Sequence, residues 1–421
     1  MPKRADAAAK EAAEQAPTLA VHAVDSLPRG ALAEKLKTAR AENRPLRVKL
    51  GIDPTAPDIH LGHAVVLRKL REFQDAGHRV VLIIGDYTAR VGDPSGRSSE
   101  RPMLSGTEID ANAATFQAQA LRILDGDRER LEVRRNSEWL DMKLDELLAL
   151  ARTTTAAQLL ERDDFAKRLA AGRPLSMLEL LYPLLQAYDS VAVRADVELG
   201  GTDQKFNLLL GRDVQRAYGQ PEQAILTMPL LVGTDGHRKM SKSLANEIGI
   251  TEPPEDVFGK TMSIPDEATG EYYRLLLEPP SHDTERPAAQ ADSSTVPRAR
   301  AGLSARDAKR ALARGLVTWL HSAEEAEAAE RQFDRVFVSR EAPEEVAETR
   351  FSAMDGVVHL PGVIAAEFGI SRSEARRLID QGGVMLGESQ LAAGEHDVPV
   401  ARAEGQLLRV GRRRFRRLKA G

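Results

Sequence analysis

The chain has 421 residues, of which 42% are hydrophobic and 29% charged, and at about 100 to 200 residues per domain this predicts two or three globular domains. The formal net charge of −4 gives no overall basic excess, so a nucleic acid could bind only at a local patch. With no cysteine, no apolar run of about 18 residues and acidic residues near the N-terminus, we expect a cytoplasmic protein without disulfides, cysteine-bound zinc or a membrane partner.

Residues 1–28 are rich in alanine and lack an apolar stripe, which predicts a flexible N-terminal extension outside the fold. Apolar residues then alternate over 46–52 as in a β-strand, and a Pro-rich turn leads into a helix predicted over 60–76. The apolar run 80–84 is long enough for a strand buried on both faces. Further helices are predicted near 107–124, 142–151, 177–189 and 203–218. Strands alternating with helices predict a doubly wound α/β, Rossmann-like catalytic domain over 29–245.

The remainder of the chain changes in character. Residues 246–353 predict an α-helical domain that contains a Pro- and Ser-rich loop at 278–300 and a helical stretch at 304–335. Residues 354–421 predict a separate small α+β module with a helix at about 372–381.

Two histidines lie where the first predicted strand and turn lead into a helix, in the segment His60-Leu-Gly-His63. Imidazole N–H groups at a helix N-terminus can bind phosphate oxygens and ribose, and Gly62 would let a ligand approach the backbone. The same spacing also fits two histidines on a helix surface, or a metal-binding pair.

A second motif, Lys239-Met-Ser-Lys-Ser243, follows a glycine-containing segment. Two ammonium groups and two hydroxyl groups on a loop can close over a polyphosphate, although a solvated basic turn is the simpler interpretation. This pentapeptide arises by chance in on the order of one chain in ten thousand. Together with His60 and His63, it resembles the ATP-binding signatures of class I aminoacyl-tRNA synthetases.

A third set of polar residues falls on one predicted helix. Tyr182, Gln186 and Asp189 are spaced i, i+4 and i+7, so they share one face. The carboxylate of Asp189 can accept a phenolic hydroxyl, and the other two can receive an ammonium group; a stripe facing solvent is the alternative. Asp93 lies in a turn after the second strand, where it is either a ligand-binding carboxylate or a turn-capping residue.

Four segments, 49–60, 92–101, 182–189 and 200–205, resemble bacterial tyrosyl-tRNA synthetases, and the resemblance extends from about residue 28 to the end of the chain. It implies that L-tyrosine is activated with ATP and Mg²⁺, without zinc, and transferred to tRNA(Tyr) by a homodimer. The better-known branch of that family has a Tyr at the position of Lys49. Lys49-Leu50-Gly51 resembles a second bacterial branch, and the resemblance assigns no role to Lys49.

The resemblance also implies roles for individual residues. Asp189 would read the phenolic hydroxyl, and the expected tyrosine-binding residues are Asp93, Tyr182, Gln186, Asp189 and Gln204. The expected ATP-binding residues are Gly51, Asp53, Gly62, Gly201, Asp203, Lys239, Met240, Ser241, Lys242 and Ser243. Adenylate formation would depend on Thr55, His60, His63, Arg97, Arg101, Lys239 and Lys242. No metal ligands are expected from the chain itself.

The C-terminal module carries basic residues that predict RNA binding. Arg372, Arg376 and Arg377 share a face of the predicted helix, and the residues after Gly405 include seven Lys or Arg and no acid. The module resembles a small RNA-binding domain first known from a ribosomal protein, and a solubilising tail is the alternative. The expected RNA-binding residues are Arg372, Arg376, Arg377, Arg412, Arg413 and Arg414.

Three other functions share part of this pattern. A tryptophan-specific relative would have both ATP signatures, but Asp189 suits a phenol. A catalytically silent RNA-binding paralogue would not need both signatures intact. A small-molecule adenylyltransferase could share His60 and His63, but it would have no use for residues 354–421.

Overall fold

The structure is a computed structural model that describes residues 2–94, 105–278, 303–338, 346–411 and 414–421. The chain forms two compact units, Met1–Leu320 and His321–Gly421. The predicted helical stretch 304–335 is two helices, α14 (Ala305–Leu320) in the first unit and α15 (Ala323–Phe333) in the second. The helical segment 246–353 is therefore divided between the units.

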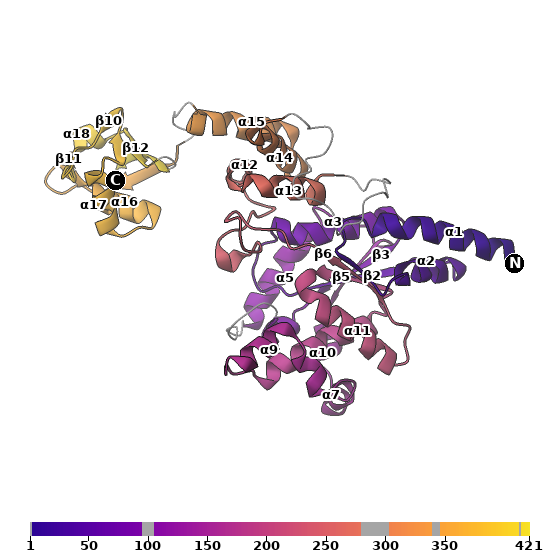
Figure 1. Cartoon of the computed structure of the whole chain (residues 1–421). Coiled ribbons are helices and arrows are strands. Elements are labelled where there is room, and N and C mark those ends of the chain that lie inside the picture. Colours follow the sequence, from indigo (N-terminus) through magenta and orange to yellow (C-terminus); the bar gives the residue numbers. More distant parts are fainter. Residues whose placement is uncertain (1, 95–104, 279–302, 339–345, 412–413) are drawn as a thin grey trace. The chain divides into compact units, whose positions relative to one another are not determined.

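The first unit is built on a six-stranded sheet with the strand order β1-β6-β5-β2-β3-β4 (Figure 1). All neighbours except β1 and β6 are parallel. The strands are β1 (Asp25–Leu27), β2 (Arg47–Ile52), β3 (Arg79–Ile84), β4 (Leu131–Arg135), β5 (Val197–Gly201) and β6 (Ala224–Met228). Helical crossovers connect β2 with β3 and β4 on one side of it and with β5 and β6 on the other. The predicted doubly wound α/β fold is therefore confirmed.

Helices cover both faces of this sheet. Besides α14, the helices of the first unit are α1 (Pro2–Leu19), α2 (Ala31–Ala41), α3 (Leu61–Asp75), α4 (Thr88–Val91), α5 (Gly106–Ala120), α6 (Ser137–Leu140), α7 (Leu144–Ala151), α8 (Ala156–Leu160), α9 (Asp163–Ala170), α10 (Met177–Ala192), α11 (Lys205–Ala217), α12 (Pro254–Ser263) and α13 (Thr269–Leu276). Short 3₁₀ turns are η1 (Thr202–Gln204), η2 (Lys242–Leu244) and η3 (Asp266–Ala268). Helix α10 begins at the N-cap Ser176, whose hydroxyl accepts the backbone N–H of Glu179 in a capping box.

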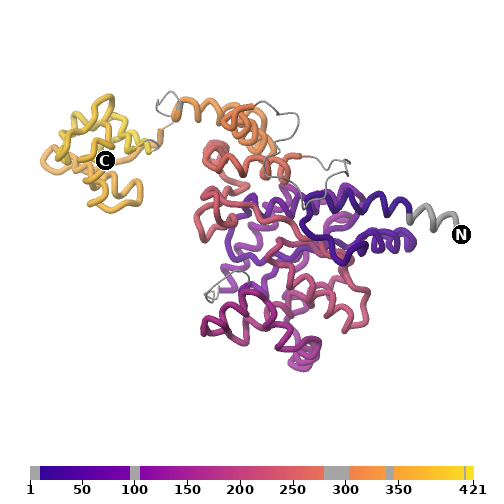
Figure 2. The backbone as a smooth tube through the Cα atoms, viewed as in Figure 1, coloured from indigo at the N-terminus to yellow at the C-terminus, as the bar shows by residue number. Residues whose placement is uncertain are grey.

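The fold begins earlier than the expected boundary at residue 29. Strand β1 pairs with β6, and helix α1 lies beside α2 (Figure 2). Ala12, Ala16 and Leu19 of α1 are buried at i, i+4 and i+7. The prediction that this segment lies outside the fold is therefore wrong from Ala12 onward. A stripe made mostly of alanine buries little area per residue, so hydropathy alone does not reveal it.

The second unit contains a five-stranded sheet, ordered β10-β9-β12-β13-β7, and a two-stranded sheet, β11-β8. Its strands are β7 (Glu348–Phe351), β8 (Val357–His359), β9 (Val384–Leu386), β10 (Ser389–Gln390), β11 (Asp397–Pro399), β12 (Leu407–Val410) and β13 (Arg414–Ala420). Its helices are α15, the π-helical turn η6 (Asp334–Val338), α16 (Leu360–Phe368), α17 (Arg372–Asp380) and α18 (Val400–Ala403). Buried Val358, Ile364, Ile379 and Leu408 join both sheets and helices in one core, so the predicted α+β module is confirmed.

Within the described ranges, no helix combines the length and the apolar character needed to cross a membrane.

Candidate active site

A cavity of about 550 Å³ opens at the carboxyl ends of β2 and β5. These neighbouring strands lead to β3 on one side and β6 on the other, so the cavity lies at the switch point of the sheet, where open α/β sheets bind ligands. Most of the residues expected at the site line it, namely Gly51, Asp53, Thr55, His60, Gly62, His63, Asp93, Tyr182, Gln186, Asp189, Gly201, Asp203, Gln204, Lys239, Met240, Ser241 and Ser243.

Asp189 is buried where α10 faces the cavity. The indole Nε1 of Trp139 donates to its Oδ1 at 2.8 Å. Its other oxygen, Oδ2, faces Gly51, where a Cβ atom would lie 4.0 Å away. Asn136 also donates a hydrogen bond to this carboxylate, so two protein donors hold Asp189 while its Oδ2 is directed toward the end of β2.

Tyr182 lies seven residues, or about two helical turns, before Asp189 on α10. Its hydroxyl donates to Oδ2 of Asp53 at 2.9 Å. The hydroxyl of Thr88 donates to the other oxygen of Asp53 at 2.7 Å. A Cβ atom at Gly85 would lie 2.1 Å from Asp53, so only glycine fits beside this carboxylate. Two hydroxyl groups thus fix Asp53, which lies just after the carboxyl end of β2.

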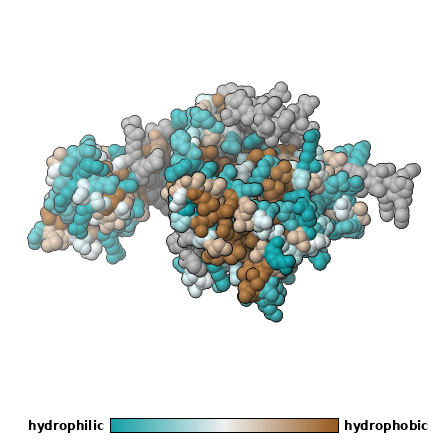
Figure 3. Space-filling view, turned by 60° about the horizontal axis from the view of Figure 1, so that its bottom comes forward, coloured by the Kyte–Doolittle hydropathy of each residue, from teal (hydrophilic) through white to brown (hydrophobic). Residues whose placement is uncertain are grey.

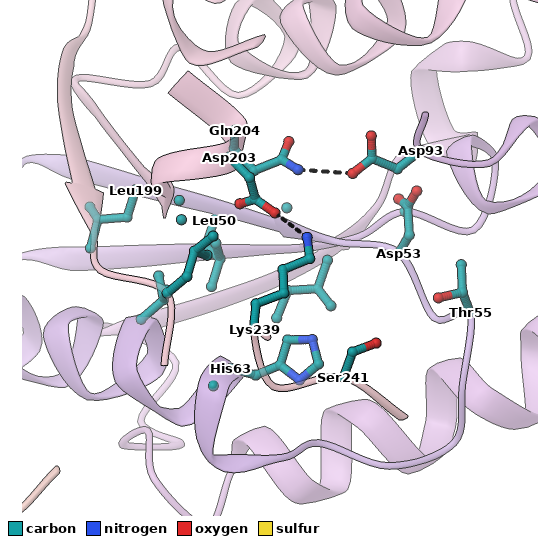
Figure 4. Close-up of a pocket in the computed structure, with 18 of the residues that line it drawn as sticks. Leu50, Asp53, Thr55, His63, Asp93, Leu199, Asp203, Gln204, Lys239 and Ser241 are labelled. Carbon is teal, nitrogen blue, oxygen red and sulfur yellow. Dashed lines mark hydrogen bonds and ion pairs between the residues drawn. The ribbon is translucent and has the colours of Figure 1, made fainter. Parts of the chain in front are cut away.

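The amide side chains form a hydrogen-bonded layer across the cavity. Gln204 donates to Oδ2 of Asp93 at 2.8 Å, as Figure 4 shows. The buried amide of Asn207 donates to Gln186 at 2.9 Å and to Gln204 at 3.0 Å. This layer joins α10, α11 and the segment after α4, so three of the expected tyrosine-binding residues, Asp93, Gln186 and Gln204, are connected with one another.

His60 and His63 stack with ring centroids 3.9 Å apart at the N-terminus of α3. The backbone N–H of His60 donates to Nδ1 of His63 at 3.4 Å. A Cβ atom at Gly62 would lie 3.0 Å from the His60 ring, which leaves little room for any other residue there. Nδ1 of His60 is buried and has no hydrogen-bond partner among the described residues.

The segment 239–243 crosses the cavity mouth. The ammonium group of Lys239 lies 2.7 Å from Oδ2 of Asp203 (Figure 4). A Cβ atom at Gly201 would lie 2.7 Å from Asp203, so a larger residue at the end of β5 would have to displace the Asp203 side chain. Lys242 differs from the expectation, because it does not line the main cavity. It pairs with Asp58 at a second cavity of about 300 Å³, which His60 also lines.

Burial sets the protonation of the ionisable groups in the cavity. It raises the pKa of Asp189 and that of Asp53 to about 7 each. Burial also lowers the pKa of His63 to about 4 and that of His60 further, where the neighbouring His63 adds to the effect. Both imidazoles are therefore neutral at pH 7 and act as hydrogen-bonding groups, while the positive charge comes from the lysines.

Arg372, Arg376 and Arg377 of the second unit are exposed on α17, opposite buried Ala375 and Ile379. Arg414 is also exposed and lies over the ring of Phe368 at 5.8 Å. The expected RNA-binding residues that are described therefore lie on the surface of one module.

Some expected residues cannot be placed. Arg97, Arg101, Arg412 and Arg413 lie outside the described residues. Conversely, Trp139, Thr88 and Asn207 contact expected site residues but were not predicted. Asn207 comes three residues after Gln204, and this helical spacing could have indicated it. Trp139 and Thr88 are reached only through tertiary contacts.

Comparisons with known proteins agree with this fold. The family described as class I tRNA synthetases for tryptophan and tyrosine matches residues 41–338. The chain therefore belongs to this family of class I synthetases. It is 47% identical to the tyrosine–tRNA ligase of Thermotoga maritima over 97% of this chain and 98% of that one, and 47% identical to that of Moorella thermoacetica over 97% and 96%. Within the class, it belongs to the tyrosine–tRNA ligases.

Solved structures show the same fold at lower sequence identity. A C-terminally truncated mitochondrial tyrosyl-tRNA synthetase of Aspergillus nidulans has a TM-score of 0.62 at 22% identity, covering 80% of this chain and 100% of that one. The tyrosyl-tRNA synthetase of Archaeoglobus fulgidus has a TM-score of 0.58 at 22% identity, covering 76% and 99%.

Proposed function

We propose that the chain activates L-tyrosine with ATP to give tyrosyl-adenylate and pyrophosphate, and then transfers the tyrosyl group to the 3′-terminal ribose of tRNA(Tyr). The observation that carries this proposal is the buried carboxylate of Asp189, which Trp139 and Asn136 hold at the cavity with its Oδ2 facing Gly51. A buried carboxylate needs a partner, and a phenolic hydroxyl supplies a proton to it. A tryptophan side chain would offer its N–H in a different place.

The other end of the substrate is recognised by the amide and carboxylate layer. Asp93 carries the charge that an ammonium group requires, and Gln186 and the hydroxyl of Tyr182 offer acceptors beside it. The amide nitrogen of Gln204 lies beside Asp93. An amide N–H can donate to a carboxylate oxygen, so we assign Gln204 to the carboxylate of the substrate, which is next to its ammonium group. These roles are consistent with the connections among the three side chains.

Adenylate formation needs no protein nucleophile, since the tyrosine carboxylate is ionised at pH 7. Its oxygen attacks the α-phosphorus, and the bond from that phosphorus to the bridging oxygen of pyrophosphate breaks, with the electron pair leaving on pyrophosphate. His60, His63, Thr55 and Lys239 line the cavity near the N-terminus of α3 and supply hydrogen bonds and charge to the phosphates. Gly51, Asp53, Gly201 and Asp203 border the nucleoside, with Asp203 on the ribose.

ATP would act as its magnesium complex. The residues that the structure describes include no group of three or more His, Asp or Glu side chains arranged to hold a metal ion. Mg²⁺ usually binds phosphate oxygens with few protein ligands, so in this proposal it enters with the substrate. Lys242, Arg97 and Arg101 remain candidates for binding the departing pyrophosphate.

The transfer step takes place on tRNA in the cytoplasm. A tRNA hydroxyl attacks the tyrosyl carbonyl, and AMP leaves. The second unit would bind the RNA backbone through the exposed arginines of α17 and Arg414, because Lys and Arg contacts with phosphate supply most of the affinity for nucleic acid. Arg412 and Arg413 extend the same basic segment in the sequence.

A homodimer is also part of the proposal. Hydrophobic side chains gather on exposed parts of the first unit (Figure 3). Leu144 and Leu148 of α7 are exposed by 70% and 57%, and Met177 at the start of the adjoining α10 by 73%. Apolar surface of this kind on two packed helices supports contact with a second copy of the chain.

Pyrophosphate exchange, measured with each of the twenty amino acids in turn, tests the proposal. Tyrosine-dependent exchange is expected. Tryptophan-dependent exchange would identify a tryptophan enzyme instead, and no exchange with any amino acid would favour an RNA-binding paralogue or an adenylyltransferase. Charging of tRNA(Tyr) with labelled tyrosine then tests the second step.

A further inference from the structure

Behind the tyrosine subsite lies a buried ion pair that the reaction itself does not use. The ammonium group of Lys49 on β2 lies 2.8 Å from Oε1 of Glu198 on β5. It also donates to Oγ of Ser190 at 2.9 Å and to the backbone carbonyl of Gln186 at 3.2 Å. Both side chains are almost wholly buried, with 0% and 2% of their surface exposed.

We propose that Lys49, held by Glu198, is the positioning residue that fixes the Gln186–Ser190 turn of α10 and stabilises the carboxylate form of Asp189, and so sets the preference for tyrosine over phenylalanine. This inference rests on the proposed function, since it requires Asp189 to read the phenolic hydroxyl.

The geometry of the turn supports this role. Lys49 contacts the backbone of Gln186 and the side chain of Ser190, which begin and end one turn of α10. The side chains of Gln186 and Asp189, on the same turn, line the cavity. Lys49 therefore binds residues 186–190 on the side opposite the cavity, while the side chains of Gln186 and Asp189 line the cavity.

The pair is itself held rigidly. Lys49 and Glu198 are register partners on adjacent parallel strands. Oε2 of Glu198 accepts a hydrogen bond from Ser190 at 3.0 Å and another from Gln223. The ammonium group of Lys49 has three N–H donors, and each has an acceptor, on Glu198, Ser190 or Gln186, so its hydrogen-bonding capacity is met. A buried ion pair can often be replaced by apolar residues without loss of stability, so stability alone is a weak reason for charges at this place.

Charge gives a second connection to Asp189. The ionisable and polar groups that face it come from several elements: Lys49 on β2, Asp53 just after β2, Glu198 on β5, Tyr182 on α10, and Asn136 and Trp139 at α6. Burial raises the pKa of Asp189 to about 7, and Lys49 is the strongest of the influences that oppose this rise. Without Lys49, the carboxylate would hold its proton to higher pH.

The test is Lys49→Met in the full-length protein, with kcat/KM for tyrosine and for phenylalanine measured by pyrophosphate exchange between pH 5.5 and 9. We expect the tyrosine-to-phenylalanine ratio at pH 7.5 to fall about tenfold, and the acid limb of the tyrosine profile to move up by about one pH unit. The pH profile separates this role from a merely structural one, since a loosened fold has no reason to move the limb in that direction.

Arg168→Met is the matched control. Arg168 forms a comparably buried ion pair with Glu179, which lies at the first turn of the same helix and away from the cavity. This variant is expected to lower the melting temperature while the ratio and the acid limb stay unchanged. If Lys49→Met does not fold, Lys49→Met with Glu198→Gln removes both charges and leaves no unpaired carboxylate. The double variant is expected to move the limb upward by less than Lys49→Met, because Glu198 itself raises the pKa of Asp189 and Lys49 has the larger influence.

The inference is overturned if the folded Lys49 variant keeps both the ratio and the acid limb of the unchanged protein, or if Arg168→Met changes them equally. Asp189→Asn separates this failure from failure of the proposed function. If Asp189→Asn leaves the tyrosine-to-phenylalanine ratio unchanged, Asp189 is not the hydroxyl reader. If Asp189→Asn lowers the ratio and Lys49→Met does not, only the role of Lys49 is lost.

Discussion

Lys239 Nζ lies 2.7 Å from Asp203 Oδ2, so the first lysine of the 239–243 segment is paired with the acid that we assign to the ribose of ATP. Both side chains are partly exposed, and such a pair contributes little net stability. In the proposed reaction, ATP would bring its ribose to Asp203 and so release the ammonium group toward the phosphates. The pairing would then hold Lys239 near the place where charge develops.

Replacing both Lys239 and Lys242 with alanine is expected to slow adenylate formation by several kcal/mol of barrier and to leave tyrosine affinity nearly unchanged. Charge builds on the departing pyrophosphate in the transition state, so these ammonium groups matter more there than in the ground state. Rapid-quench measurement of adenylate formation and equilibrium binding of tyrosine check this. Lys37→Ala, which breaks an exposed pair with Glu34, is the control. Equal losses in tyrosine binding and in rate would contradict the assignment.

Replacing Asp189 with asparagine should reduce kcat/KM for tyrosine about 10- to 100-fold, the range of a hydrogen bond to a charged group. Activation of phenylalanine should fall much less, because phenylalanine makes no such bond. Pyrophosphate exchange with both amino acids gives the ratio, and equal losses for the two would assign the recognition of the hydroxyl to another residue.

The same substitution should stabilise the empty protein at alkaline pH. Because the folded-state pKa of Asp189 is raised to about 7 from 3.8, the folded protein binds a proton that the unfolded chain has lost. The free energy of unfolding therefore falls as pH rises from about 4 to about 7 and stays low above that. Asparagine has no such dependence, so the gain in melting temperature should be larger at pH 8 than at pH 5. A gain independent of pH would show that Asp189 does not ionise in this range.

Replacing Arg372, Arg376 and Arg377 together with glutamine should weaken tRNA binding and reduce its salt dependence, by about one unit of slope for each arginine that binds a phosphate. Tyrosine-dependent pyrophosphate exchange should stay unchanged, because these arginines lie in the second unit. Binding measured by filter retention at several salt concentrations gives the slope. Truncation after residue 345, which removes all of β7 to β13, should abolish charging and spare exchange. A truncated protein that charges tRNA normally would exclude an RNA-binding role for the module.

Replacing Leu148 with glutamate is expected to convert the protein to monomers, because a carboxylate would be buried without a partner in the proposed interface. Light scattering over a range of protein concentrations gives the mass. Leu303, which is 47% exposed, provides the control substitution, since Leu303→Glu should leave the mass unchanged. If Leu148→Glu has the same mass as the unchanged protein, α7 is not part of a dimer interface.

The sequence by itself determined the parallel sheet and most of the residues that line the cavity at its edge. Apolar runs such as 80–84 specify buried strands, and the periodic spacing of Tyr182, Gln186 and Asp189 places them on one face of a helix, because these patterns are local. The segments around His60 and Lys239 could likewise be predicted, since each motif is contiguous in the chain.

Only the tertiary structure decided what lies behind those residues. The pairing of Lys49 with Glu198 joins positions 149 residues apart, and the bond from Trp139 to Asp189 spans 50. Neither has a local pattern, because they depend on the order of β2 and β5 in the sheet and on the packing of α6 against α10. Helix α1 was not predicted for a related reason: its alanine stripe has little hydropathy of its own and is buried because α2 and α3 pack against it.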